Sequence, residues 1–325
     1  MLRVTFLGTA SSRPTVRRNV SALAVQREGE SYLFDCGEGT QRQMMRFGVG
    51  FRMDEIFITH MHADHYLGLT GLLRTMSLQG RDRPLTVWGP PGGRRTLRRA
   101  VELGGDRLLF GVSLEELSPG EAVRREGYRI EAYATRHTSR SVGLVLEEDP
   151  RLGRFDPERA RELGVPEGPL FGRLHRGEEV ELEDGTVVRP EQVVGSPRPG
   201  RKLVYTGDTR PCRATVEAAR EADLLIHEAT FGDPETDRAA DTGHSTAREA
   251  ARTAAEAGAR RLALTHFSAR YSEQAHRLGR QAGEVVEDPV VAEDGLTVEV
   301  PFPEEGEDGD EGAASRPAAR EAGRR

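Results

Sequence analysis

One short stretch of the chain, Ile58–Tyr66, brings together three of the nine histidines and an aspartate. These four residues are His60, His62, Asp64 and His65. The stretch lies between an apolar run typical of a strand, Glu55–Thr59, and a helical pattern over Tyr66–Leu78. Imidazole nitrogen and carboxylate oxygen are ligands that Zn²⁺ prefers, usually four to an ion. The stretch therefore predicts a turn between a strand and a helix that holds metal.

Two simpler interpretations of this cluster stand beside the metal site. Histidines in a loop are usually surface residues, although a chance cluster this dense is improbable. A single structural zinc is the second interpretation, but structural sites are usually closed by cysteines, and the stretch has none. We therefore expect His60 and His62 to face one metal ion, and Asp64 and His65 to face a second.

Three other predicted strands also end in a possible metal ligand. His137 follows Tyr128–Ala134, Asp208 follows Leu203–Tyr205, and His266 follows Arg261–Leu264. An aspartate after a strand and a glycine could instead cap a turn. However, the two oxygens of a carboxylate would let Asp208 bridge two cations. Together, the four strand ends predict a two-metal site built from residues far apart in the sequence.

The remaining pattern alternates apolar runs with amphipathic ones, and strands dominate both halves of the chain. Two β-rich halves with helices outside favour a layered α/β sandwich whose loops meet at one edge. Two regions depart from this pattern. Residues 149–201 are rich in Gly, Pro, Arg and Glu, and residues 303–325 are charged and free of large apolar side chains. We expect the second region to be disordered because it cannot bury enough apolar surface to fold.

Composition and charge limit the surroundings of the protein. The net charge is −7, which gives no global indication of nucleic-acid binding. Two cysteines cannot make a disulfide framework, and neither a signal-peptide pattern nor an apolar run of membrane-spanning length is present in the sequence. These features predict a cytoplasmic protein without a membrane partner.

Several motifs together resemble a known family. The metal motifs alone are similar to the metallo-β-lactamase superfamily. The motifs FDCGEGTQRQ, ELGVPEGPLFGRL, YTGDTRP, HEATF and GHSTA are more specific, and they resemble the short form of ribonuclease Z, the tRNA 3′-processing endonuclease. The resemblance implies an α/β metallo-β-lactamase fold over 1–302, a four-layer αββα sandwich with a flexible arm inserted at 149–201. One departure is Val16, which stands where a lysine is typical of the family's P-x-K-x-R-N loop.

The same resemblance implies the residues of the site and two Zn²⁺ per subunit. One ion would use His60, His62, His137 and Asp208, and the other would use Asp64, His65, Asp208 and His266. Asp64 would also orient and deprotonate the attacking water, His244 would protonate the leaving oxygen, and Glu228 would hold His244. Alternatively, His244 could be a surface residue near a helix N-cap, and Glu228 could be a buried structural carboxylate.

The activity that the resemblance implies is that of a zinc-dependent endoribonuclease. It would remove the 3′ trailer from tRNA precursors, leaving a 3′-hydroxyl on the tRNA and a 5′-phosphate on the trailer. The family acts as a homodimer in which the arm of one subunit holds precursor tRNA for the other. Between Arg151 and Arg176 the arm has six arginines and four acids, which favours phosphate contacts; the alternative is a solvated loop with no partner.

Two rival functions remain open from the sequence. The chain could be another dinuclear phosphodiesterase or a small-ester hydrolase, because a fold does not determine a function. It could also be a non-catalytic RNA-binding protein that kept the fold. Deleting the arm would test the first alternative, because such enzymes would not need it. Measuring the metal content would test the second, because fewer than one zinc per chain would favour a non-catalytic protein.

Overall fold

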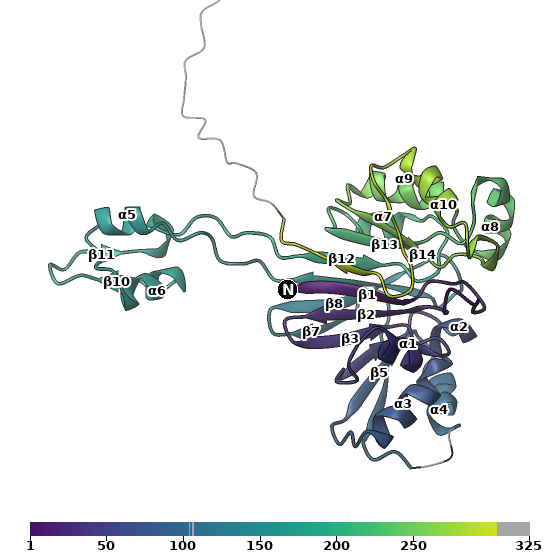
Figure 1. Cartoon of the computed structure of the whole chain (residues 1–325). Helices are drawn as coiled ribbons and strands as arrows, with labels where there is room; N and C mark the ends of the chain where they lie inside the picture. The colour runs from purple at the N-terminus through teal and green to yellow at the C-terminus, as the bar shows by residue number, and fades with distance from the viewer. Residues whose placement is uncertain (104, 106, 304–325) are drawn as a thin grey trace, which may run out of the picture.

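Two β-sheets packed face to face, with helices on both outer sides, form the body of the protein (Figure 1). The computed structural model describes residues 1–103, 105 and 107–303. Apart from Pro303, the charged tail predicted at 303–325 lies outside the described residues, and so does its predicted disorder.

The first sheet comes from the N-terminal half and one late strand. In spatial order its strands are β16 (Thr297–Glu299), β1 (Leu2–Gly8), β2 (Ala22–Arg27), β3 (Glu30–Phe34), β4 (Glu55–Phe57), β5 (Leu85–Gly89) and β6 (Val112–Glu116). The strands from β3 to β6 are parallel. Their carboxyl ends therefore lie at one edge of the sheet.

The second sheet comes from the C-terminal half. Its strands are, in spatial order, β15 (Val290–Val291), β14 (Leu262–Thr265), β13 (Leu224–Glu228), β12 (Lys202–Tyr205), β9 (Val142–Glu148), β8 (Tyr128–Ala134) and β7 (Ala122–Arg125). The strands from β12 to β15 are parallel. Because β9 is antiparallel to both β8 and β12, β8 runs in the same direction as β12. The ends of β8, β12, β13 and β14 therefore share one edge.

Alternate residues of the strands fill the space between the two sheets. Phe6 and Phe34 of the first sheet, and Tyr205 and Ile226 of the second, are buried in this core. The rings of Phe34 and Tyr205 stack with their centroids 6.3 Å apart. Side chains alternate between the faces of a strand, so the other face of each sheet is left for the helices.

Helices cover the outer face of each sheet. On the first sheet these are α1 (Thr40–Arg46), α3 (Gly68–Leu78) and α4 (Arg94–Glu102); on the second they are α7 (Arg213–Ala218), α9 (Ala247–Ala257) and α10 (His276–Gly283) (Figure 1). Buried alanines on one face of α9 let it pack closely on β13 and β14. The predicted four-layer αββα sandwich is thus confirmed. Within the described residues no helix has the length and apolar character that crossing a bilayer requires.

The segment between β9 and β12, which we call the arm (residues 149–201), projects away from the sandwich (Figure 1). Its outer part holds α5 (Pro157–Glu162), α6 (Pro169–His175) and a ribbon of β10 (Val180–Glu181) with β11 (Val187–Val188). A small apolar core of its own holds these elements together, and it includes Ala160, Leu174 and Val188. The sequence did not predict these two helices or the ribbon.

Candidate metal centre and catalytic site

The seven predicted metal ligands lie together at the edge where the two sheets meet. His60 and His62 precede α2 (Ala63–Tyr66), which carries Asp64 and His65. His137, Asp208 and His266 follow β8, β12 and β14. One group of ligand atoms comes from His60, His62, His137 and Asp208, and a second comes from Asp64, His65 and His266, with the atoms of each group within 4.8 Å of one another. Loops of both sheets therefore contribute residues to each of the two groups.

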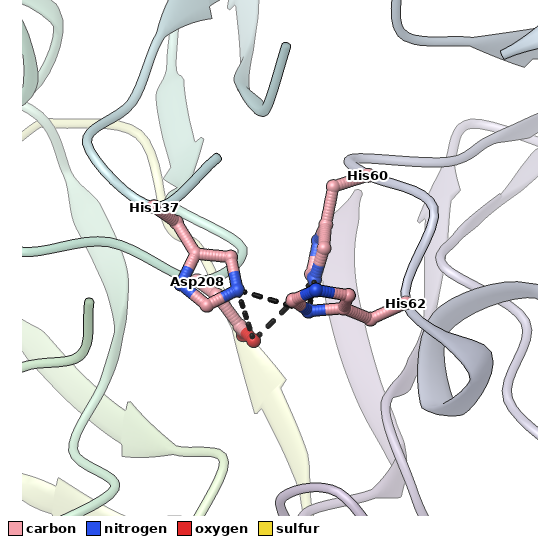
Figure 2. Close-up of side chains that lie close together, drawn as sticks. All are labelled: His60, His62, His137 and Asp208. Atoms are coloured by element: carbon pink, nitrogen blue, oxygen red, sulfur yellow. Dashed lines mark hydrogen bonds and ion pairs between the residues drawn. The ribbon is translucent and has the colours of Figure 1, made fainter. Parts of the chain in front are cut away.

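The first group is shown in Figure 2, where histidines from two different loops converge. Nδ1 of His62 lies 3.1 Å from Nε2 of His60 and 3.0 Å from Nε2 of His137. Oδ2 of Asp208 lies 3.5 Å and 3.7 Å from the same Nε2 atoms of His60 and His137. Three imidazole nitrogens and a carboxylate oxygen around one point form a donor set suited to Zn²⁺.

The second group lies on the other side of Asp208. Nε2 of His65 is 3.5 Å from Oδ2 of Asp64, and Nε2 of His266 is 3.4 Å from the same oxygen. Asp208 reaches both histidines, with Oδ2 at 3.4 Å from His65 and Oδ1 at 3.2 Å from His266. Asp208 is therefore placed between the two groups, as a bridging carboxylate would be.

Buried atoms without a hydrogen-bond partner indicate that these groups suit cations. Within the described chain, such atoms include Nε2 of His65, Nε2 of His266 and Oδ1 of Asp208. Buried polar atoms are normally paired, and an atom that is not paired calls for an explanation such as an ion. Burial alone would raise the pKa of Asp208, but the histidines around it hold that pKa well below its usual value. The residues therefore fit bound metal.

The second ring nitrogen of each of four histidines is held by a neighbouring group. Nδ1 of His65 donates to Asp35 at 2.7 Å, and Nδ1 of His137 donates to the carbonyl of Gly243 at 2.9 Å. Nδ1 of His60 lies 3.1 Å from the hydroxyl of Thr59, and Nδ1 of His266 lies 3.0 Å from the hydroxyl of Thr230. With Nδ1 protonated, each Nε2 has its lone pair directed at the site. Such contacts fix the orientation and tautomer of metal-binding histidines.

Asp35 is a residue of this network that the sequence did not single out. Its buried carboxylate accepts from Nδ1 of His65, from the backbone and hydroxyl of Thr59, and from the hydroxyl of Tyr205. Its φ is 57°, in the left-handed region that L residues seldom adopt. The motif FDCGEG could have indicated its role, because Asp35 directly follows strand β3, as the candidate ligands follow other strands.

Asp64 is also held by the backbone of another loop at the site. The N–H of Ser12, in the loop after β1, donates to Oδ2 of Asp64 at 2.7 Å. Ser12 has a φ of 61°, and His266 has a φ of 59°. Strained backbone of this kind is concentrated at functional sites, where surrounding contacts maintain it.

The predicted acid and its partner lie beside the second group. Nδ1 of His244, between α8 (Thr236–Thr242) and α9, donates to Oε1 of Glu228 at 2.8 Å. Glu228 is fully buried at the end of β13, and it also accepts from the hydroxyl of Thr230 at 2.7 Å. Burial lowers the pKa of His244, but the Glu228 carboxylate outweighs it and raises that pKa to about 9. His244 is therefore a buried, carboxylate-bound histidine rather than a surface residue at a helix N-cap.

Comparison with known proteins places this site in a family. Residues 188–267 match a family model described as "Beta-lactamase superfamily domain", and residues 2–153 match one described as "Anti-Pycsar protein Apyc1". "Ribonuclease Z" of Myxococcus xanthus is 55% identical over 303 residues, which cover 93% of this chain and 99% of that protein. The chain belongs to the ribonuclease Z family.

Further members of the ribonuclease Z family are similarly close. "Ribonuclease Z" of Haloferax volcanii is 57% identical over 303 residues, covering 93% of this chain and 96% of that protein. The crystal structure of the short form of human tRNase Z is 32% identical, with a TM-score of 0.67, and the match covers 92% of this chain and 100% of the human chain. The family and fold implied by the sequence motifs are confirmed, and the cluster of histidines and aspartates indicates a metal-binding enzyme.

Proposed function

We propose that this chain is a zinc-dependent endoribonuclease that removes the 3′ trailer from tRNA precursors. Cleavage leaves a 3′-hydroxyl on the tRNA and a 5′-phosphate on the trailer. The near full-length similarity to proteins named ribonuclease Z carries this proposal, and the arrangement of the site supports it. Seven potential ligands lie within reach of one another, beside a histidine that is held by a buried carboxylate.

Two Zn²⁺ per subunit fit the residues of the site. His60, His62, His137 and Asp208 would hold one ion, and Asp64, His65, Asp208 and His266 would hold the other. When bound, the ions supply positive charge that favours ionised water and stabilises the anionic transition state of phosphodiester hydrolysis. Buried Asp208, which lies between the two groups, would be shared by both ions.

The remaining steps belong to side chains of this chain. Asp64, held by the N–H of Ser12, orients the attacking water and takes its proton. His244 gives its proton to the leaving 3′ oxygen of the tRNA as general acid. Glu228 keeps that proton available because it holds Nδ1 of His244 and favours the charged imidazole.

The arm is the part of the chain that would grip the tRNA away from the metals. It projects from the sandwich (Figure 1), and its helix α5 presents the exposed residues Arg159 and Arg161. Phosphate contacts with arginines give salt-dependent affinity, and structured RNA is recognised mainly by its shape. In a homodimer, the arm of one subunit would hold precursor tRNA for the active site of the other. We place this enzyme in the cytoplasm.

The Asp64→Ala variant tests the proposed mechanism. It should abolish cleavage of precursor tRNA and leave binding of the RNA largely intact, because the arm is unchanged. Cleavage of an end-labelled precursor and a filter-binding titration measure the two properties. Substantial residual turnover by the variant would refute the assigned role of Asp64.

Two further measurements separate the rival functions. A phosphodiesterase for small substrates would not need the arm to bind its substrate. If the chain acts on precursor tRNA as proposed, a variant in which a short linker replaces residues 152–197 should lose affinity for precursor tRNA and keep its turnover of small substrates. Unchanged affinity would exclude the arm as the RNA-binding element.

Metal analysis after gentle purification should give two zinc ions per chain; fewer than one would favour a non-catalytic RNA-binding protein.

A further inference from the structure

A buried ion pair joins the two ends of the arm. Arg201, which is 2% exposed, lies directly before β12, and Glu148 is the last residue of β9. Nε and Nη2 of Arg201 each donate to one oxygen of Glu148 at 2.7 Å, and Nε of Arg27 donates to Oε1 of the same carboxylate at 2.8 Å. This forked, buried geometry is specific and rigid. It fixes the two points at which the arm leaves and re-enters the sandwich.

The C-terminal segment lies across the same two points. The ring of Phe302 faces the guanidinium of Arg151 at 3.7 Å and that of Arg201 at 4.0 Å. Arg151 belongs to the outgoing part of the arm, and Arg201 ends the returning part. A single aromatic ring therefore contacts both connections.

Phe302 is itself anchored to the sandwich. The N–H of Val300 donates to the carbonyl of Leu2 in β1 at 2.8 Å, and Nη1 of Arg201 donates to the carbonyl of Val300 at 3.4 Å. Only one residue separates Val300 from Phe302. The position of the ring is thus tied to the first sheet through Val300, as well as to the end of the arm through Arg201.

These contacts give the root of the arm a second support. Beyond the root, the two connecting segments form no named strands and are joined by isolated bridges, such as Arg151 with Arg198, and by single hydrogen bonds, such as that from Nε of Arg198 to the carbonyl of Leu152 at 3.0 Å. A small rotation at the root would move the outer part of a projecting arm much further. Arginine–aromatic contacts resist such a rotation because the guanidinium must stay over the face of the ring.

We propose that Phe302 is a positioning residue that clamps the root of the arm and sets the direction in which the arm projects. The effect of this clamp on catalysis rests on the proposed function, in which a correctly directed arm holds precursor tRNA in register with the metal centre. Loss of the clamp should therefore weaken RNA binding without changing the chemistry at the metals.

Pulsed electron-spin distance measurements test the clamp without RNA. Spin labels would be placed at Glu183→Cys in the arm and Glu256→Cys in α9, both exposed positions, in full-length protein that also carries Cys212→Ser. Phe302→Ala should broaden the distance distribution, and Phe302→Leu should broaden it too, because leucine keeps apolar bulk but has no π face. Phe302→Trp should restore the narrow distribution. An unchanged distribution in Phe302→Ala, or equal rescue by leucine and tryptophan, would overturn the proposal.

Kinetics then test the consequence for the enzyme. Phe302→Ala should raise KM for precursor tRNA by about three- to tenfold, a loss on the scale of one cation–π contact. Turnover of bis(p-nitrophenyl) phosphate should not change, and Phe302→Trp should restore KM. If the distance distribution broadens while KM is unchanged, the clamp stands and the proposed role of the arm in binding RNA is wrong. If small-substrate turnover falls equally, Phe302 supports the whole fold rather than the arm, and the proposal fails.

Discussion

At the scale of single residues, buried carboxylates determine what the histidines of the site can do. The carboxylate of Asp35 accepts a hydrogen bond from Nδ1 of His65, and that of Glu228 accepts one from Nδ1 of His244. A carboxylate can only accept, so each ring must direct its Nε2 away from it. The first arrangement leaves an Nε2 lone pair that a metal ion can use, and the second leaves an Nε2 proton that the proposed mechanism gives to the leaving oxygen.

The Asp35→Asn substitution should weaken zinc binding by about 10- to 100-fold. The amide can donate an N–H to Nδ1 of His65, whereas the carboxylate can only accept from it. His65 would then adopt the tautomer with its proton on Nε2, which leaves no lone pair on that atom for a metal ion. Titration against a chelating dye measures the affinity. The matched control is Tyr205→Phe, which removes one donor to Asp35 and leaves the contact with His65 intact. Wild-type affinity in Asp35→Asn would contradict this role.

The Glu228→Gln substitution should lower kcat for precursor tRNA by about 100-fold, with KM nearly unchanged. The amide has no charge to stabilise protonated His244, and the arm, which we propose binds the RNA, is not affected. Single-turnover cleavage measures the effect. Because His244 and Glu228 act as a unit, adding His244→Ala should cause little further loss. Fully additive losses would show that the two residues act separately.

At the scale of elements, the ends of the arm depend on the pair between Glu148 and Arg201. Burial of Glu148 would raise its pKa, but the bonds from Arg201 outweigh burial and hold the pKa below the ordinary value for a glutamate, which is about 4.3. The folded state therefore binds fewer protons than the unfolded chain near that pH. The stability from this pair is fully present above the unfolded pKa and is lost as pH falls through the lower, folded pKa.

Replacing Glu148 with glutamine should lower the free energy of unfolding at pH 7 by about 3 kcal/mol, because Arg201 would stay buried without its charged partner. Urea titrations between pH 7 and pH 3 measure the change. The difference from the wild-type protein should shrink below about pH 4.3, the ordinary pKa of glutamate. A difference that stays constant over this range would show that the charge of Glu148 contributes nothing.

The sequence predicted elements well where apolar runs are long and poorly where they depend on distant contacts. The strands Tyr128–Ala134 and Val142–Leu146 were found because their inward residues fill the core between the sheets. Helix α5 has only six residues, too few for a clear helical period, and it is stabilised by the small core of the arm. The role of Asp35 was missed because its partners lie on other segments that only the tertiary fold brings together.

At the scale of the whole molecule, the site exists only where the two sheets meet. The first sheet supplies the loop with His60, His62, Asp64 and His65, and the second supplies His137, Asp208 and His266. The candidate ligands could be named from the sequence because each follows a strand. The layered pattern also predicted that the loops meet at one edge, but the distances between these residues depend on how the sheets pack.

The proposed homodimer makes a prediction at this scale. A chain with Asp64→Ala keeps its arm but has no activity, and a chain with a short linker in place of residues 152–197 keeps its site but loses the arm. Each variant alone should cleave precursor tRNA poorly. Mixing the two after subunit exchange should restore activity, because one subunit's arm then serves the other's site. No recovery, with exchange verified by native mass spectrometry, would mean that each arm serves its own subunit.

The position and chemistry of the cut test the central claim most directly. Zinc-loaded enzyme would be incubated with end-labelled precursor tRNAs, with and without an encoded CCA sequence, and both new ends would be mapped. We predict one cut at the 3′ side of the tRNA, with a 3′-hydroxyl on the tRNA and a 5′-phosphate on the trailer. A 2′,3′-cyclic phosphate on the tRNA, or no cleavage of either precursor, would contradict the account.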